Sequence, residues 1–382
     1  LAVPIFTLMK VSVFLSDILV SRKFFTIPMI AGLVVNFGVL ISIFLFASSW
    51  GVASMAAGMM AAHALNIAMM LRLMKKEFGW EFISKKPDFA PHVSKNVLFS
   101  QLGSGAAIVA SYVPMFLLSG FSSGTVSSLN FGRQVADLPN SLLTQQASAV
   151  SGIKFNEMTA HGDGPGLHRA FSTAAAGPAF LLVPVAVAGS YYAPEVIKLL
   201  FGRGQFGPVS VKLSASFMRV FLLAVPFNAV ATLVARLFMA EQKISQSFWY
   251  QVAYNAAILV LALLLIKKFG ALGYPAALLV LQVANLPICL PLLKAYAPSV
   301  RYSEVLGRLF RITAYEAALF LPVAAMDWLL LRQLPLVPRM TIASAVYVLL
   351  ISLCNKSFNL EPESRELVGK LLRLPRKLFP KF

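Results

Sequence analysis

The segment of residues 26–47, TIPMIAGLVVNFGVLISIFLFA, decides the fold class because it contains no Asp, Glu, Lys or Arg. As an α-helix rising about 1.5 Å per residue, it is long enough to cross the ~30 Å hydrocarbon core of a bilayer. Other apolar runs in the chain are equally long and unbroken, which favours helices over the short alternating strands of a membrane barrel. The sequence therefore predicts an all-α membrane protein.

The composition of the whole chain agrees with this reading. Of its 382 residues, 58% are hydrophobic and only 13% are charged, and the mean hydropathy is +0.76. Soluble globular proteins carry about 25% charged residues, so this chain is too poor in charge to cover a soluble surface. A soluble enzyme, a nucleic-acid-binding protein and a disordered scaffold are excluded on this ground.

Eleven apolar stretches are predicted to span the membrane, which makes the chain a polytopic helical bundle. Most of them contain proline, which membrane helices tolerate where neighbours or water satisfy the freed carbonyl, and such kinks suit a bundle that encloses a cavity. The predicted spans are residues 1–20, 26–47, 51–73, 97–119, 125–150, 171–192, 210–235, 247–266, 271–293, 309–331 and 339–354.

The net charge of +18 is explained by membrane topology. With these spans, 23 of the 33 Lys and Arg residues fall on one side and seven on the other, and Lys and Arg collect on the cytoplasmic side of membrane proteins. The split predicts a cytoplasmic C-terminus, an N-terminus near the outer face and no nucleic-acid partner. The remaining three of the 33 are counted on neither side because they lie further from the ends of their spans: Lys10, Arg133 and Arg219.

The first three spans recur further along the chain. Asn36, Gly51, Asn66 and Lys75 are each followed, 219 residues later, by the same residue type: Asn255, Gly270, Asn285 and Lys294. Each helix of the second copy lies six spans after its counterpart, so the copies share one orientation and form parallel repeats, an architecture of transporters. The second copy ends a six-helix block, whose first three helices have no counterpart upstream. We therefore expect the intact protein to have fourteen helices, with a stretch preceding Leu1.

Five regions follow from this organisation. We expect residues 1–73 to be the last three helices of an N-terminal lobe, and residues 97–293 to be a six-helix C-terminal lobe. An amphipathic cytoplasmic linker of residues 74–96 joins them. A C-terminal helix pair occupies residues 305–354, and residues 355–382 form a basic cytoplasmic tail suited to anionic lipid.

Charged and polar residues inside spans mark the candidate site, since an Arg at the bilayer centre costs ~3 kcal/mol and is rarely there for packing. Arg133 and Asp137 are four residues apart on one helix face and can pair. Ser127, Asn130, Asn140, Gln145 and Gln146 give the same span a polar stripe. Lys10 and Arg219 have two possible roles: they line the cavity, or their long side chains extend to the membrane interface. No metal or cofactor site is expected, because the Cys and His residues lack ligand spacing.

Three stretches resemble the MurJ/MviN family of lipid II flippases, within the multidrug/oligosaccharidyl-lipid/polysaccharide exporter superfamily. LFGRGQF at 200–206 resembles the loop before the family's tenth helix. Residues 124–139 resemble its eighth helix, and residues 1–36 resemble its fourth and fifth. In an ungapped comparison the family's functional arginine falls on Gln134, and the preceding residue on Arg133. Asp137 keeps the family's acidic position, while the family's other key arginines lie in its first two helices, which precede Leu1.

The resemblance implies a bacterial inner-membrane flippase for a polyprenyl-diphosphate-linked saccharide, most simply lipid II, without a cofactor. Expected partners are that substrate, membrane lipids and cell-wall synthesis proteins. Arg133, Asp137, Gln134, Ser127, Asn130, Lys10 and Arg219 are the expected substrate-binding residues. An exopolysaccharide or O-antigen repeat-unit flippase is the alternative function, followed by a drug exporter. A membrane enzyme is disfavoured, because the outer loops offer only Glu195 as an acid and the chain has no phosphate-binding GxxxxGK[ST] motif.

Overall fold

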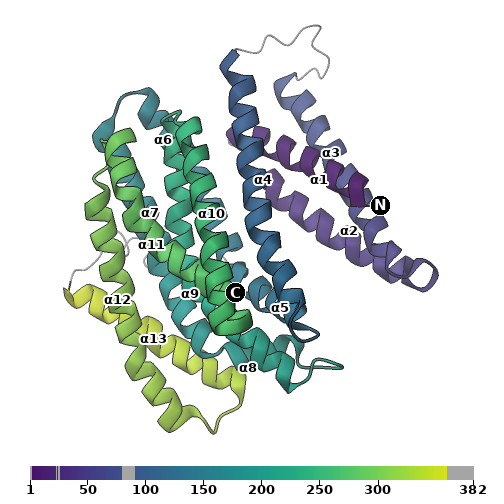
Figure 1. The fold of residues 1–382 in the computed structure, drawn as a ribbon, viewed down its shortest axis with the longest axis vertical. Helices are drawn as coiled ribbons and strands as arrows, with labels where there is room; N and C mark the ends of the chain where they lie inside the picture. The colour runs from purple at the N-terminus through teal and green to yellow at the C-terminus, as the bar shows by residue number, and fades with distance from the viewer. Residues whose placement is uncertain (1, 23, 25, 80–90, 359–382) are drawn as a thin grey trace, which may run out of the picture. The chain divides into compact units, whose positions relative to one another are not determined.

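The computed structural model describes residues 2–22, 24, 26–79 and 91–358. The chain divides into two compact units, Leu1–Ala90 and Pro91–Phe382, shown in Figure 1. The first unit contains α1 (Ala2–Ser21), α2 (Thr26–Trp50) and α3 (Ala53–Phe78). Residues 80–90 of the predicted linker of residues 74–96, and residues 359–382 of the predicted tail of residues 355–382, lie outside the described residues.

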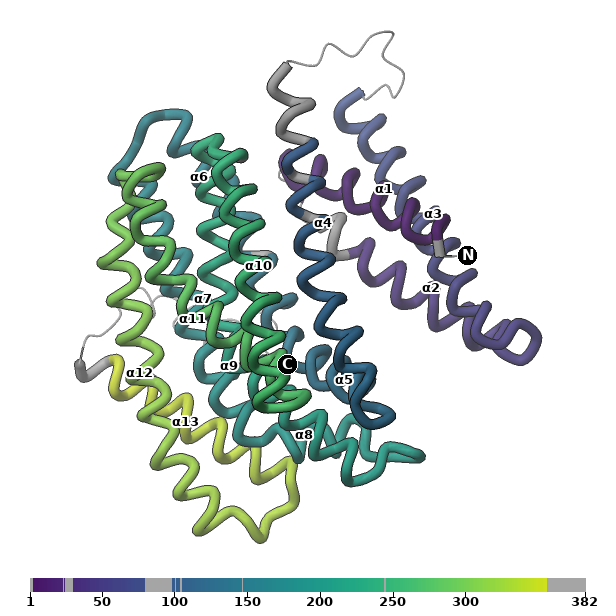
Figure 2. The backbone as a smooth tube through the Cα atoms, viewed as in Figure 1, coloured from purple at the N-terminus to yellow at the C-terminus, as the bar shows by residue number. Residues whose placement is uncertain are grey.

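The second unit begins with α4 (Pro91–Ser119) and consists of long helices that run back and forth, as the tube in Figure 2 traces. The others are α5 (Thr125–Pro139), the π-turn η1 (Asn140–Thr144), α6 (Gln145–Ala160), α7 (Gly164–Tyr191), α8 (Ala193–Phe201), α9 (Pro208–Ala240), α10 (Ile244–Phe269), the 3-10 turn η2 (Gly270–Leu272), α11 (Gly273–Tyr296), α12 (Tyr302–Met326), the π-turn η3 (Asp327–Leu331) and α13 (Leu336–Phe358).

The prediction of an all-helical membrane bundle is confirmed. Each of the eleven predicted spans corresponds to a helix, with α5, η1 and α6 together forming the fifth. Nine stretches of the described residues are long and apolar enough to cross a membrane, and one of them, Ser245–Tyr296, contains both α10 and α11. No strand occurs in the part of the chain that the structure describes.

Small side chains let two helices of the first unit pack closely. A Cβ added at Gly38 or Gly58 would lie 2.8 Å or 2.6 Å from the Cβ atoms of Ala62 and Ser42. The hydroxyl of Ser42 donates a 2.7 Å hydrogen bond to the carbonyl oxygen of Ser54. Close backbone approach with small residues and polar cross-links is how helices associate in membranes, where lipid is as apolar as a leucine core.

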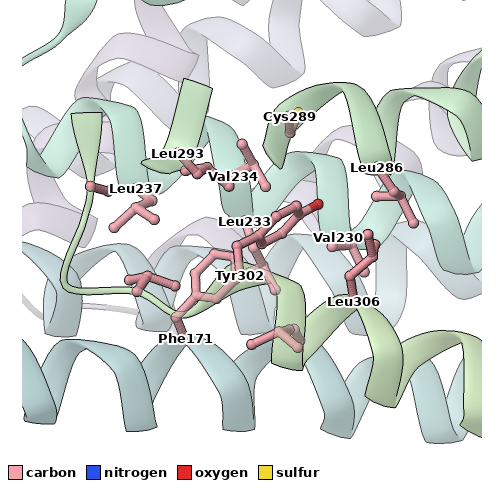
Figure 3. Packing of buried hydrophobic residues seen from close by; sticks show 14 of the residues in the cluster. Phe171, Val230, Leu233, Val234, Leu237, Leu286, Cys289, Leu293, Tyr302 and Leu306 are labelled. Carbon is pink, nitrogen blue, oxygen red and sulfur yellow. The ribbon is translucent and has the colours of Figure 1, made fainter. Parts of the chain in front are cut away.

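α9 is the central helix of the second unit. It packs against α5, α6, α7, α8 and α11, and its apolar stretch is more buried than that of any other candidate span among the described residues. Figure 3 shows one of its contacts, where Val230, Leu233 and Leu237 meet Phe171 of α7 and Tyr302 at the start of α12. α5, which carries the predicted site, packs on an earlier part of α9, in a second buried cluster where its Leu129 and Ala136 meet Phe217 and Met218.

The structure differs from the predicted elements at several boundaries; α7 and α12, for example, each begin seven residues earlier than predicted. The fifth span continues as helix to Ala160, ten residues beyond its predicted end, with a π-turn after Pro139, a residue type that interrupts helical hydrogen bonding. The short helix α8 was not predicted. α4 begins at Pro91, so residues 91–96 are helical rather than part of a separate linker.

The two copies of the repeat share local structure. α1 packs on α3 far more than on α2, and α9 likewise packs on α11 far more than on α10. The turns between the second and third helices contain Gly51 at φ +52° and Gly270 at φ +61°, which favour glycine. Asn66 donates to the carbonyl oxygen of Ala31 at 2.9 Å, and Asn285 accepts from the hydroxyl of Tyr250, which lies 219 residues after Ala31. These features support the repeat.

Candidate functional site

α5 has two different faces. Its buried side consists of Thr125, Ser128, Leu129, Gly132 and Ala136, and this side packs against α9. The opposite side is exposed and polar, and its residues recur at helical spacing: Ser127, Asn130, Gln134, Asp137 and, in the π-turn, Ser141. A polar stripe on a membrane helix marks a surface that faces water or substrate rather than lipid.

Gly132 sets the distance between α5 and α9. A Cβ at this position would lie 2.5 Å from the carbonyl oxygen of Ser214 and 2.9 Å from the backbone nitrogen of Met218. Both of these atoms belong to the backbone of α9, so a side chain could be accommodated only by moving a helix. The glycine therefore allows α5 to seat directly on the central helix, which fixes the direction of its polar face.

Arg133 and Asp137 form an ion pair across one turn of α5. Arg133 Nε donates to Asp137 Oδ2 at 3.4 Å, and the two side chains are 39% and 53% exposed. Exposed pairs of this kind contribute little to stability, typically below about 1 kcal/mol, so the pair can open at low cost. Tyr274 of α11 lies beside the Arg133 guanidinium, which places the arginine at the edge of the buried core.

An open pocket joins most of the predicted residues. Its lining consists of Asn130, Arg133, Gln134, Asp137, Leu138 and Ser141. The residue types supply a guanidinium, a carboxylate, two amides and a hydroxyl, which can bind phosphate and sugar groups. Ser127 lies on the same exposed face, one turn before Asn130, but does not line this pocket.

The two remaining predicted residues lie elsewhere. Arg219 of α9 lines a different pocket, with Lys198 and Lys212, and its Nε donates to the carbonyl oxygen of Ser190 at 3.1 Å. Lys10 belongs to α1 of the first unit, where it is exposed and its Nζ lies 5.2 Å from the ring centre of Phe6. The structure thus brings four of the seven predicted residues together in one pocket.

A buried ion pair escaped the sequence analysis. Asp327, in the π-turn η3, has no exposed side-chain surface, and Arg339 of α13 binds both of its carboxylate oxygens. The hydroxyl of Tyr191 donates to the same carboxylate at 3.0 Å, and Arg339 also lies 3.9 Å from Glu195. The pair ties the α12–α13 hairpin to the ends of α7 and α8. The sequence did contain a signal for this pair, because Asp327 lies near the end of one apolar run and Arg339 lies at the start of the next.

The described residues contain no group of three His, Cys, Asp or Glu side chains able to hold a metal ion. Cys289 is buried and Cys354 is half-buried, and both are free thiols. The chemistry that the site offers is therefore that of its own charged and amide side chains. Such groups can bind and release an anion.

A multi-pass helical bundle that carries an easily opened ion pair in an open polar pocket has the architecture of a membrane transporter. The model of the family described as lipid II flippase MurJ matches residues 1–347. The chain belongs to this family.

Two curated relatives are similar to the chain at low identity. A probable lipid II flippase MurJ of Bdellovibrio bacteriovorus is 21% identical over 285 residues, covering 74% of this chain and 53% of the relative. One of Borreliella burgdorferi is 21% identical over 264 residues, covering 68% of this chain and 51% of the relative. The chain thus spans about half the length of the curated relatives that it matches.

A solved structure shows the same fold. Lipid II flippase MurJ in an inward closed conformation superposes with a TM-score of 0.67 at 16% sequence identity, covering 93% of this chain and 73% of that one. At this identity the likeness concerns the arrangement of helices. It agrees with the family assignment.

Proposed function

We propose that this chain acts in a lipid II flippase, moving a polyprenyl-diphosphate-linked saccharide from the inner to the outer leaflet of the bacterial inner membrane. One observation supports the proposal most directly. The Arg133–Asp137 pair stands in an open pocket on the polar face of α5, in a chain that belongs to the MurJ family.

The diphosphate is the part of such a substrate that cannot cross hydrocarbon unaided, because its charge loses hydration there. A guanidinium replaces that hydration with two parallel hydrogen bonds to phosphate oxygens. In the empty site the carboxylate of Asp137 is paired with the guanidinium of Arg133. Substrate diphosphate displaces the carboxylate, and Asp137 takes the arginine back when the substrate leaves.

Gln134 and Asn130 complete the proposed site. Gln134 stands at the position where the resemblance expects an arginine, and its side chain shares the pocket with Arg133 and Asp137. An amide has both donors and acceptors, so it suits sugar hydroxyls as well as phosphate oxygens. In this proposal Arg133 binds the diphosphate of the substrate, and the amides of Gln134 and Asn130 bind the substrate's polar groups next to the diphosphate.

Transport would proceed by rocking of two helical lobes, with the C-terminus in the cytoplasm as the charge distribution predicts. The proline-containing helices and the π-turn after Pro139 provide places where helices bend. Moving one unit of charge across a membrane potential of 100 mV changes the free energy by about 2.3 kcal/mol. This is enough to drive an empty carrier with net positive charge back to its inward-facing state.

The test is complementation of a bacterial strain depleted of its own lipid II flippase. Arg133→Ala should abolish growth, while Arg133→Lys should retain part of the activity because it keeps the charge but loses the planar guanidinium. Arg332→Ala, a change at a turn outside the pocket, is the matched control and should support growth. Immunoblots of membrane fractions verify equal protein levels. Normal growth with Arg133→Ala would show that the site assignment is wrong.

A further inference from the structure

A second pocket of the larger unit collects positive charge. Lys198 comes from the last turn of α8, and Lys212 and Arg219 come from α9. The latter two are seven residues apart, so they lie on one face of the helix and are separated by about 10 Å along its axis. The cations of two elements therefore converge on one space.

No acid in the described part of the chain neutralises these three side chains. None of them takes part in an ion pair there. Glu195 lies one turn before Lys198 on α8, but its carboxylate is 3.9 Å from the guanidinium of Arg339. Three uncompensated cations around one pocket repel one another, and a bound anion would relieve that repulsion.

Backbone contacts hold the walls of this pocket. Arg219 Nε donates to the carbonyl oxygen of Ser190 at 3.1 Å, and the Ser190 hydroxyl donates to the carbonyl oxygen of Arg219 at 3.2 Å. Gly202 closes α8 with a 2.8 Å hydrogen bond from its nitrogen to the oxygen of Lys198. A Cβ at Gly202 would lie 2.4 Å from that same oxygen, so a side chain would push this wall apart.

Apart from Ser216, the rest of the lining is apolar and indicates an amphiphilic ligand. Pro194, Phe206, Val211 and Ala215 border the same space as the three cations. α9 has 33 residues, or about 50 Å, whereas the hydrocarbon core is about 30 Å thick. The beginning of α9, including Lys212, therefore reaches the depth of lipid headgroups. A phosphate attached to a lipid would meet both the cations and the apolar border.

We propose that Lys198, Lys212 and Arg219 form a binding site for the phosphate group of a lipid, distinct from the pocket of Arg133. The chemistry fits either an anionic phospholipid or a polyprenyl diphosphate. With the charge-based topology, the site lies at the outer surface of the membrane. The phospholipid form of this proposal does not depend on the proposed flippase function.

Native mass spectrometry of the purified full chain in detergent can measure lipid binding directly. The probes are phosphatidylglycerol, undecaprenyl diphosphate and, as a zwitterionic reference, phosphatidylethanolamine. The test variant is Lys198→Gln with Lys212→Gln and Arg219→Gln. The matched control, Lys267→Gln with Lys268→Gln and Arg332→Gln, removes the same charge at the same end of the helices. Lys212→Glu alone, at an exposed position, serves if the triple variant does not fold.

We expect the test variant to bind an anionic probe at least ~10-fold more weakly, about 1.4 kcal/mol, and the control to bind like the wild type. If the test variant loses binding of undecaprenyl diphosphate alone, the site belongs to a lipid-linked diphosphate. Loss for phosphatidylglycerol, with or without the other, would assign it to phospholipid. Wild-type binding of both anionic lipids by the test variant and by Lys212→Glu would overturn the proposal. An equal loss in the control would overturn it as well.

Discussion

At the scale of single residues, a displacement of one position changes less than helix geometry suggests. Adjacent residues on an α-helix point about 100° apart, so by helix geometry alone the side chains of Arg133 and Gln134 leave the helix in different directions. The structure shows Arg133 and Gln134 lining one pocket. The long arginine side chain extends one turn along the helix to Asp137.

Gly132 carries a testable expectation about packing. Gly132→Ala places a methyl group 2.5 Å from the carbonyl oxygen of Ser214, and forcing the helices apart should destabilise the protein by about 1–3 kcal/mol. Thermal unfolding in detergent measures the change.

Gly105→Ala is the control for that experiment, because a Cβ at Gly105 meets no atom within 4 Å. Replacing an exposed helical glycine by alanine should leave stability unchanged or raise it by up to about 1 kcal/mol. Equal effects of the two substitutions would contradict the close approach of α5 and α9.

At the scale of elements, the hydrophobic runs predicted the helices because each helix that crosses a membrane must be apolar for about 20 residues. The same criterion missed α8, which has nine residues and is amphipathic. It also ended the fifth span too early, because the helix continues to Ala160 beyond the apolar run. Length and hydropathy locate the membrane-crossing part of a helix, whereas capping and local packing decide where the helix ends.

The Asp327–Arg339 pair should determine how firmly the α12–α13 hairpin is attached. Removing one partner of a buried pair leaves the other charge uncompensated and costs about 3–5 kcal/mol. Asp327→Ala should therefore lower the unfolding temperature and speed proteolytic cleavage in the turn of residues 332–335.

The exposed pair of Arg301 and Glu304 provides the comparison for that variant. Their nitrogen and oxygen lie 3.1 Å apart, and the side chains are 70% and 57% exposed. Glu304→Ala should cost no more than about 1 kcal/mol. A larger effect from Glu304→Ala than from Asp327→Ala would show that burial does not set the strength of these pairs.

At the scale of the whole molecule, topology follows from charge and can be tested by labelling. In a Cys354→Ser background, Gln205→Cys should react with a membrane-impermeant maleimide added to intact cells. His161→Cys should react only after the membrane is opened, because Lys and Arg accumulate on its side. Both positions are exposed turns, and native Cys289 is 1% exposed. The reverse pattern would invert the proposed orientation.

The site was predictable in part. Spacing along one helix predicted that Arg133 and Asp137 share a face and can pair, because a four-residue step returns to the same side. The separate location of Arg219 depends on which neighbours surround α9, and a single helix does not reveal that. The partner of Asp327 depends on the turn that brings α13 back toward α12. Contacts within a helix can be read from spacing, but contacts between helices require the fold.

The asparagines of the two repeats have a consequence for the history of the chain. Asn66 uses its amide nitrogen as a donor to a backbone oxygen, while Asn285 uses its amide oxygen as an acceptor from a tyrosine. The two copies thus share the asparagine and differ in the group that it binds. An amide permits this exchange because it carries both a donor and an acceptor. The residue at position 31 or 250 could thus change during divergence while the asparagine kept a hydrogen bond between the two helices.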